Sequence, residues 1–179
     1  MPEAKALGLT PMDIFHEIEE ASRQYKPQFR TVMEKYGFTL SVPYRGELET
    51  LYPDANPVLN ALSQKYSLGV IANQAQGLQK RLEEWHIARY FSAFASSWDV
   101  GVSKPDPAIF RYALSLAGCA PERALMIGDR LDNDIFPAKA LGMKTLRIMQ
   151  GFGALQIPKS PDYIPDLTVC SLKELLTVL

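Results

Sequence analysis

The sequence has few cysteines and histidines, the residues that stabilise many small proteins through disulfides or bound zinc. Its 179 residues include two cysteines, Cys119 and Cys170, and two histidines, His16 and His86. The cysteines lack a C-x-x-C spacing and no histidine cluster accompanies them, so neither a disulfide framework nor a zinc site is predicted. We expect both cysteines to be buried free thiols.

Long apolar runs and a surplus of one charge are also missing. No stretch approaches the roughly 20 apolar residues that a membrane helix needs, and the start MPEAKALGLT lacks the pattern of a signal peptide. The net charge is -1 and the pI is about 6.1, with lysine and arginine scattered along the chain. We therefore expect neither a nucleic-acid nor a membrane partner. The sequence predicts a cytoplasmic protein, and its 47% hydrophobic content is enough for a real core.

The first fifty residues carry a helical period. Thr10 and Pro11 are typical of a helix start, and Gly37 is typical of a helix end in the left-handed conformation. The apolar positions that recur at helical spacing between them are Ile14, Phe15, Ile18, Ala21, Tyr25, Phe29, Val32, Met33 and Tyr36. We predict an all-helical segment over residues 1–52.

After the turn sequence TLYPDANP, strands and helices alternate. Strands are expected at LGVIAN (68–73), FSAFASS (91–97), RALMIGD (123–129) and KTLRIM (144–149), and helices at 57–65, 78–85, 107–116, 133–141 and within 171–179. This order predicts an α/β domain over residues 53–179, in which helices cover both faces of a parallel sheet.

The stretch MIGDRLDND places Asp129, Asp132 and Asp134 directly after an apolar strand. Acids crowded in this way usually hold a cation. In open parallel sheets, ligands bind beyond the carboxyl ends of the strands. Asn73 and Lys104 follow two other predicted strands, so we expect them to face the same site.

Three segments carry a family resemblance: VIANQ, then GVSKPDPAIF, then MIGDRLDNDIFPAKALGM. In this order they resemble the second, third and fourth motifs of the haloacid dehalogenase superfamily of hydrolases, most of which are magnesium-dependent phosphatases. The resemblance covers about residues 50–179. It implies a Rossmann-like parallel sheet, a Mg²⁺ cofactor and a small phosphorylated substrate.

The resemblance also implies roles for single residues. Asp129 matches a direct magnesium ligand, and magnesium typically takes only one or two carboxylates. Asp134 matches the second acidic position, either as a ligand through water or as a holder of neighbouring groups. Lys104 would neutralise the phosphate and the acid that attacks it. Asn73 would donate to a phosphate oxygen, whereas Asp132 is expected to face solvent.

Two departures from the family are visible. The family has Ser or Thr where this chain has Ala72, so one hydroxyl donor is missing. The family's first strand ends in an Asp-x-Asp motif that supplies the nucleophile and the acid–base group. Here Asp13 is the only aspartate before Asp54, and it lies inside the first predicted helix. The sequence thus has the magnesium acids and the lysine, but no nucleophile.

The family places a helical cap between its first strand and the rest, and residues 1–52 resemble that cap. The absent strand would lie in the middle of the sheet, between those at LGVIAN and RALMIGD. An empty slot would leave about five buried backbone groups unpaired on each neighbour, at roughly 1 to 3 kcal/mol each. We therefore predict that the two strands pair directly, or that the chain's own amino terminus or a partner molecule fills the slot. A homodimer is one way to fill it.

Three functions remain open. The first is a magnesium-dependent phosphatase that works through an aspartyl phosphate, with this chain inactive or weakly active because it lacks the nucleophile. The second is a non-catalytic relative that binds magnesium and a phosphorylated ligand. The third is a structural or interaction protein that uses only the fold.

Overall fold

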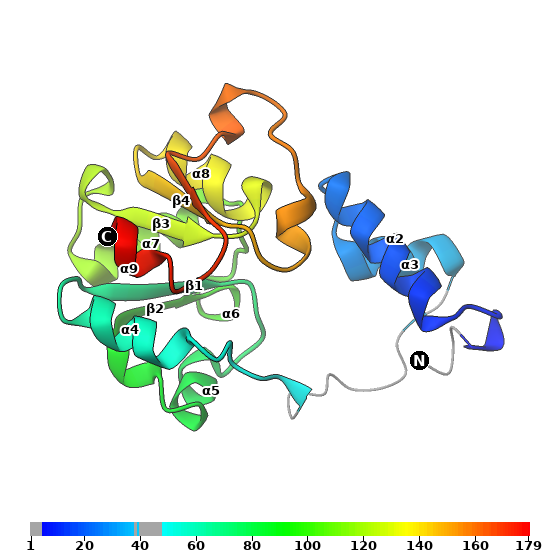
Figure 1. Ribbon diagram of the computed structural model, residues 1–179, viewed down its shortest axis with the longest axis horizontal. Coiled ribbons are helices and arrows are strands. Elements are labelled where there is room, and N and C mark those ends of the chain that lie inside the picture. The colour runs from blue at the N-terminus through cyan, green and yellow to red at the C-terminus, as the bar shows by residue number, and fades with distance from the viewer. Residues whose placement is uncertain (1–4, 38, 40–47) are drawn as a thin grey trace. The chain divides into compact units, whose positions relative to one another are not determined.

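The computed structural model describes residues 5–37, 39 and 48–179 (Figure 1). The chain divides into two compact units. The helical unit comprises Met1–Thr50 and Gly151–Ile157, and the core unit comprises Leu51–Gln150 and Pro158–Leu179. Parts of the predicted cap, residues 1–4, 38 and 40–47, lie outside the described residues.

Two helices form most of the helical unit: α2 (Pro11–Arg23) and α3 (Gln28–Tyr36). The side chain of Thr10 accepts from the backbone N–H of Asp13, whose carboxylate accepts from the backbone N–H of Thr10. This reciprocal pair satisfies two of the N–H groups that a helix start leaves free. Gly37 adopts the left-handed conformation at the end of α3. Both helix boundaries predicted from the sequence are confirmed.

A distant segment completes the helical unit. The buried side chains of Ile14, Ile18 and Val32 pack with Phe152, which lies in the turn Phe152–Leu155. The hydroxyl of Ser22 donates to the backbone carbonyl of Phe152 at 2.6 Å. The sequence did not predict that residues 151–157 belong with the first fifty, because this contact spans more than a hundred positions of the chain.

The core unit alternates strands and helices as expected. Its elements are α4 (Ala55–Ser63), β1 (Leu68–Ala72), α5 (Leu78–Glu84), β2 (Phe91–Ser96), α6 (Ser97–Val100), α7 (Pro107–Ala117), β3 (Leu125–Gly128), a short π-helix (Leu131–Ile135), α8 (Phe136–Ala140), β4 (Lys144–Ile148), β5 (Leu167–Val169) and α9 (Leu175–Val178). All four predicted strands are confirmed. The short elements β5 and α6 were not predicted, because three or four residues carry too little periodicity.

The strands form two separate parallel sheets, β1–β2 and β3–β4–β5. Of the three predicted alternatives, direct pairing of β1 and β3 is therefore wrong, no strand from the described part of the amino terminus fills the slot, and a partner molecule stays a prediction. Helices pack across the gap between the two sheets: α7 packs in one core cluster with β2 and β3, and α4 packs with β3 and β4 in another. Within the described residues, no strand pairs with the free edges of β1 and β3.

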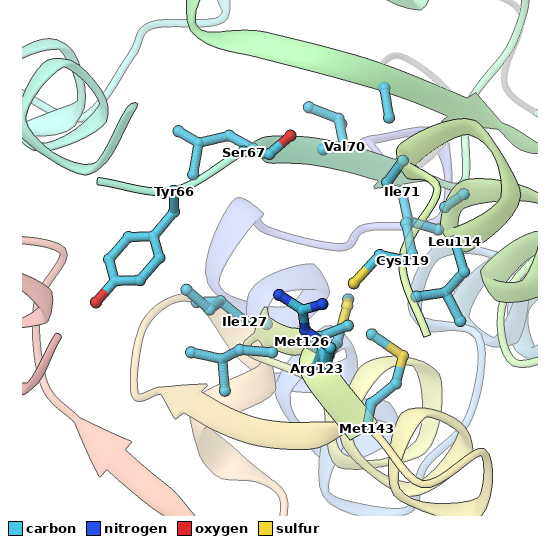
Figure 2. Close-up of a pocket in the computed structure, with 18 of the residues that line it drawn as sticks. Tyr66, Ser67, Val70, Ile71, Leu114, Cys119, Arg123, Met126, Ile127 and Met143 are labelled. Atoms are coloured by element: carbon cyan, nitrogen blue, oxygen red, sulfur yellow. The ribbon is translucent and has the colours of Figure 1, made fainter. Parts of the chain in front are cut away.

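The free edges of β1 (Leu68–Ile71) and β3 (Leu125–Gly128) border one cavity of about 990 Å³, which we call the strand slot. Figure 2 shows Val70 and Ile71 on one side of the strand slot and Met126 and Ile127 on the other. The residues of β1 stay half-exposed or exposed, so their backbone groups remain open to solvent. This exposure removes much of the cost expected for buried unpaired groups.

Both cysteines are free. Cys119 is half-buried and lines the strand slot, whereas Cys170 is exposed, so the prediction that both are buried is wrong. Over the part of the chain that the structure describes, no helix is long and apolar enough to cross a membrane.

Candidate active site

The carboxyl ends of β1 and β3 meet at one cluster of polar side chains. Asn73 follows β1, Asp129 and Asp134 follow β3, and Lys104 comes from the loop between α6 and α7. Lys104, Asp129 and Asp134 line the same end of the strand slot. The structure therefore brings together the residues that the sequence predicted for the site.

The side-chain amide of Asn73 forms two hydrogen bonds with the backbone of Lys104. Its amide nitrogen donates to the carbonyl of Lys104 at 2.9 Å, and its amide oxygen accepts from the N–H of Lys104 at 2.6 Å. This pair of bonds ties the end of β1 to the lysine loop. One amide hydrogen and the backbone N–H of Asn73 remain for the phosphate contact, which stays a prediction.

Lys104 and Asp134 form a buried ion pair. The lysine Nζ lies 2.6 Å from Oδ1 of Asp134, and their side chains are 13% and 4% exposed. The second oxygen, Oδ2, accepts from the backbone N–H of Arg130 at 3.0 Å. Both oxygens of Asp134 are thus engaged in fixing the lysine and the turn that follows β3.

Gly128 leaves the space that Asp134 fills. A Cβ built on Gly128 would lie 2.5 Å from Cβ, Cγ and Oδ2 of Asp134. The aspartate cannot move aside, because its two oxygens hold Lys104 and Arg130. A glycine at the end of β3 is therefore a requirement of this site.

This close approach gives a first prediction. We expect Gly128→Ala to lower the free energy of unfolding by about 1 to 3 kcal/mol, the usual range for overpacking a tight site. Gly69→Ala in β1 is the matched control, because its added Cβ would meet only ordinary contacts, the nearest at 3.4 Å. Urea unfolding of both variants measures the difference. Equal stability of the two would show that Asp134 can shift without penalty.

Asp132 does not face solvent, so that prediction is wrong. Its side chain is only 19% exposed and lies 2.6 Å from the guanidinium of Arg130. A second bond at 3.0 Å, from Nε of Arg130 to Oδ1, makes the pair bidentate. The sequence placed Arg130 directly after the strand but did not predict this pair, because residues two apart in an ideal helix do not face each other. Here Arg130 is extended and precedes the π-helix that contains Asp132.

Asp129 has no such partner. Within the described part of the chain, no side chain donates a hydrogen bond to its carboxylate. Burial raises the pKa of this carboxyl, and the charge of Asp134 raises it further, whereas its own backbone N–H, Lys104 and Arg130 act in the opposite direction. A cation beside Asp129 would relieve the unfavourable burial of its charge.

This donor set suits Mg²⁺. The described residues contain no group of three or more His, Cys, Asp or Glu side chains that could hold a metal ion. Magnesium usually takes one or two carboxylates and fills its remaining positions with water and substrate phosphate. A single free carboxylate at the end of a strand therefore fits magnesium better than a metal that needs an all-protein cage.

Sequence reasoning missed one residue of the site. Arg147 lies on β4, is only 5% exposed, and donates from Nε to the backbone carbonyl of Asp129 at 3.3 Å. It holds the segment that carries the free carboxylate. The available signal was a charged residue inside the otherwise apolar run TLRIM.

Comparison with known proteins gives a family match. Residues 3–148 match the model of the haloacid dehalogenase-like hydrolases. The chain is 36% identical over 129 residues to the glyceraldehyde 3-phosphate phosphatase of Methanopyrus kandleri, covering 71% of this chain and 55% of the relative. It is also 36% identical over 126 residues to the phosphoserine phosphatase of Thermus thermophilus, covering 69% and 49%. The chain thus spans about half the length of these relatives.

A solved structure shows the same fold. The magnesium-bound putative hydrolase YfnB of Bacillus subtilis aligns with a TM-score of 0.70 at 22% identity, covering 99% of this chain and 87% of that one. This similarity supports the α/β fold with parallel strands and flanking helices.

Proposed function

We propose, from the premise that this chain belongs to the haloacid dehalogenase-like hydrolases, that its site serves the magnesium-dependent hydrolysis of a small phosphate ester. The observation that carries the proposal is the convergence of Lys104, Asp134 and Asp129 at the carboxyl ends of β1 and β3. One fixed cation and one free carboxylate at the same place suit a phosphate group and its magnesium ion.

Each residue has a separate task in this proposal. Lys104 neutralises the phosphate, and its ammonium is held in place by Asp134. Asn73 fixes the backbone of Lys104 and donates its remaining N–H groups to phosphate oxygens. Asp129 is the magnesium ligand. For Asp134 we favour the role of holder over that of ligand, because both of its oxygens already accept hydrogen bonds. Magnesium, when bound, would neutralise charge on the phosphate.

The relatives suggest the size of the substrate. Two of them are phosphatases of glyceraldehyde 3-phosphate and of phosphoserine, which are both three-carbon phosphate esters. We extend this class to the present chain as a proposal. We propose that the helical unit, which resembles the family's cap, contributes to the choice among such esters.

The residues of this chain do not supply the attacking group. In the proposed aspartyl-phosphate route, a carboxylate displaces the alcohol from phosphorus, and water then releases the phosphate. No Asp-x-Asp precedes the helical unit in these 179 residues. We therefore propose that the chain by itself is inactive or weakly active. The alternative is a protein that binds magnesium and a phosphorylated ligand without turnover.

Magnesium titration tests the metal role of Asp129. We expect calorimetry to show one magnesium-binding event in the parent protein. In Asp129→Asn, the affinity for magnesium should be at least about tenfold weaker. Asp162→Asn changes an exposed aspartate of the core unit and should titrate like the parent. Equal binding by Asp129→Asn and the parent would refute the assignment. If the parent protein did not bind magnesium, the remaining function would be that of a structural or interaction protein that uses only the fold.

The raised pKa of Asp129 adds a pH dependence. A proton and a magnesium ion compete for the same carboxylate, so affinity falls as pH drops through the pKa of that group. Because this pKa lies above the ordinary value of 3.8, magnesium binding should weaken at a higher pH than at an exposed aspartate. Titrations repeated between pH 7 and about pH 3 measure the midpoint. A midpoint at or below 3.8 would contradict the burial of this charge.

A further inference from the structure

Arg147 is a buried cation in the middle of an apolar strand. It lies on β4 between Leu146 and Ile148, and only 5% of its surface is exposed. β4 lies beside β3 (Figure 1) and pairs with β5 on its other edge, so the backbone at Arg147 is fixed from both sides. Burying a charged group costs free energy unless that group is hydrogen-bonded. A contact that an apolar residue could not make would explain its presence there.

The register of the sheet directs this guanidinium towards the carboxyl end of β3. Arg147 pairs with Gly128, the residue just before Asp129. Leu146 and Ile148 pack in the core cluster that contains α4, so the alternation of side chains along a strand places Arg147 on the opposite face. From that face, Nε of Arg147 donates to the backbone carbonyl of Asp129 at 3.3 Å. The donor is charged, which strengthens such a bond.

The peptide between Asp129 and Arg130 is held at both of its polar groups. Its carbonyl oxygen accepts from Arg147, and its N–H donates to Oδ2 of Asp134 at 3.0 Å. The two groups belong to one planar trans peptide and point in opposite directions. A bond to each of them therefore fixes the rotation of this plane about the chain. We call the peptide and its two bonds the peptide clamp.

The carboxylate of Asp129 depends on this peptide for its direction. Within the part of the chain that the structure describes, no other side chain donates a hydrogen bond to it. The aspartate side chain is short, so the direction of its carboxylate follows closely from the placement of its backbone. Metal ligands are normally held in place by hydrogen-bonded groups behind them. For Asp129, the peptide clamp supplies this support.

We propose that Arg147 is a positioning residue of the site, which holds Asp129 through the peptide clamp in the direction in which its carboxylate binds magnesium. This inference rests on the proposed function, in which Asp129 is the magnesium ligand. Arg147 acts through the backbone, because it keeps the metal-free site close to the arrangement that binding requires. Asp134 joins the same clamp to Lys104, whose Nζ lies 2.6 Å from its Oδ1. One chain of bonds thus holds both the magnesium ligand and the phosphate cation.

Electrostatics alone would give Arg147 the opposite effect. A positive charge near a magnesium site repels the ion, so removing that charge should tighten binding. The positioning role instead requires weaker binding after the same change. The sign of the change in magnesium affinity therefore separates the two roles.

A pair of variants tests the Nε bond. Methionine and glutamine are both neutral and of similar length, but glutamine carries an N–H donor where arginine has Nε, whereas methionine carries a methyl group. Calorimetry on the full chain should show magnesium affinity at least about tenfold weaker in Arg147→Met. Arg147→Gln should stay within about threefold of the parent, because the donor is retained. Urea unfolding checks that each variant is folded, and Arg147→Leu replaces Arg147→Met if the latter is not.

Hydrogen exchange without magnesium tests the peptide clamp itself. The N–H of Arg130 belongs to the clamped peptide, and its exchange should quicken about three- to tenfold in Arg147→Met, because one bond of the clamp is lost. In Arg147→Gln it should stay near the parent rate. Unchanged exchange in Arg147→Met would show that Arg147 does not hold this peptide, and would overturn the proposal whatever the metal does.

Thr145→Val is the matched control in the same strand. Thr145 is fully buried and lies on the same face of β4 as Arg147, but its hydroxyl donates to Asp166 at 2.9 Å and not to the site. This variant should lose stability in urea unfolding and keep the magnesium affinity of the parent. A similar loss of affinity in Thr145→Val would assign the effect to general strand packing and overturn the proposal.

The remaining outcomes separate this inference from the proposed function. Equal or tighter magnesium binding in Arg147→Met would overturn the positioning role while the proposed function stands. Equal weakening in Arg147→Met and Arg147→Gln would assign the effect to lost charge or packing, and would overturn the positioning role too. If the parent protein bound no magnesium, the proposed function would fail and the positioning role would fail with it.

Discussion

Hydrolysis of p-nitrophenyl phosphate by residues 1–179 should be about 10⁴ to 10⁶ times slower than by an intact phosphatase of the family, the range seen when the nucleophile of a cooperating set is removed. The reason is that, in the proposed site, Lys104 would bind the phosphate and Asp129 the magnesium ion, whereas the described residues place no further carboxylate than Asp134 there to attack phosphorus. The phosphoserine phosphatase of Thermus thermophilus, assayed with equal magnesium, is a suitable reference.

The control for this assay is Asp129→Asn, prepared by the same procedure. If the small remaining activity belongs to a contaminating phosphatase, parent and variant will share it equally. Rapid turnover that requires magnesium and disappears in Asp129→Asn would refute the prediction. That result would mean that another group of the chain attacks phosphorus.

The second large effect concerns stability. Asp134→Ala should lower the free energy of unfolding by about 3 to 5 kcal/mol, because it leaves a buried charge without its partner. The charge left behind is the ammonium of Lys104, whose side chain is only 13% exposed. Asp134→Ala also removes the acceptor of the Arg130 backbone N–H, which adds to the loss.

A double variant separates these contributions. Lys104→Met with Asp134→Ala removes the stranded ammonium, so it should recover part of the loss, with a coupling of about 0.5 to 3 kcal/mol in a double-mutant cycle. Glu17→Ala serves as the control, since it removes one partner of the more exposed pair with Lys35 and should change stability much less. Urea unfolding of the parent, Asp134→Ala, Lys104→Met, the double variant and Glu17→Ala gives all five values. If the double variant is no more stable than Asp134→Ala, the ammonium is not the source of the effect.

The strands of the core unit could be predicted because each is a short apolar run with turn residues on both sides. Asp129 and Lys104 could be placed at one site because the carboxyl ends of parallel strands share an edge. The bidentate pair of Arg130 and Asp132 could not be predicted, since it depends on a turn whose geometry the pattern does not reveal. The contact of Arg147 with the backbone carbonyl of Asp129 could not be predicted either, because a sequence does not show which carbonyl a buried guanidinium will reach.

The gap between β1 and β3 shows a different limit of prediction from sequence. The sequence correctly identified both strands, but the prediction of a direct pair assumed that an empty slot would be buried and unsolvated. In the structure, α4 and α7 each pack against side chains from more than one strand, and the edges between them remain half-exposed. Local patterns identify strands, whereas their partners are set by the packing of helices that lie far apart along the chain.

The division of the helical unit into two stretches affects how the protein is made. Residues Ser22 and Phe152 are bonded to each other although 130 positions separate them. At 5 to 20 residues per second, a ribosome would add the second about 6 to 26 s after the first. During that time, Ile14, Ile18 and Val32 lack part of their final apolar partner surface. The apolar face of the first two helices therefore stays incompletely covered until the segment that carries Phe152 has been synthesised.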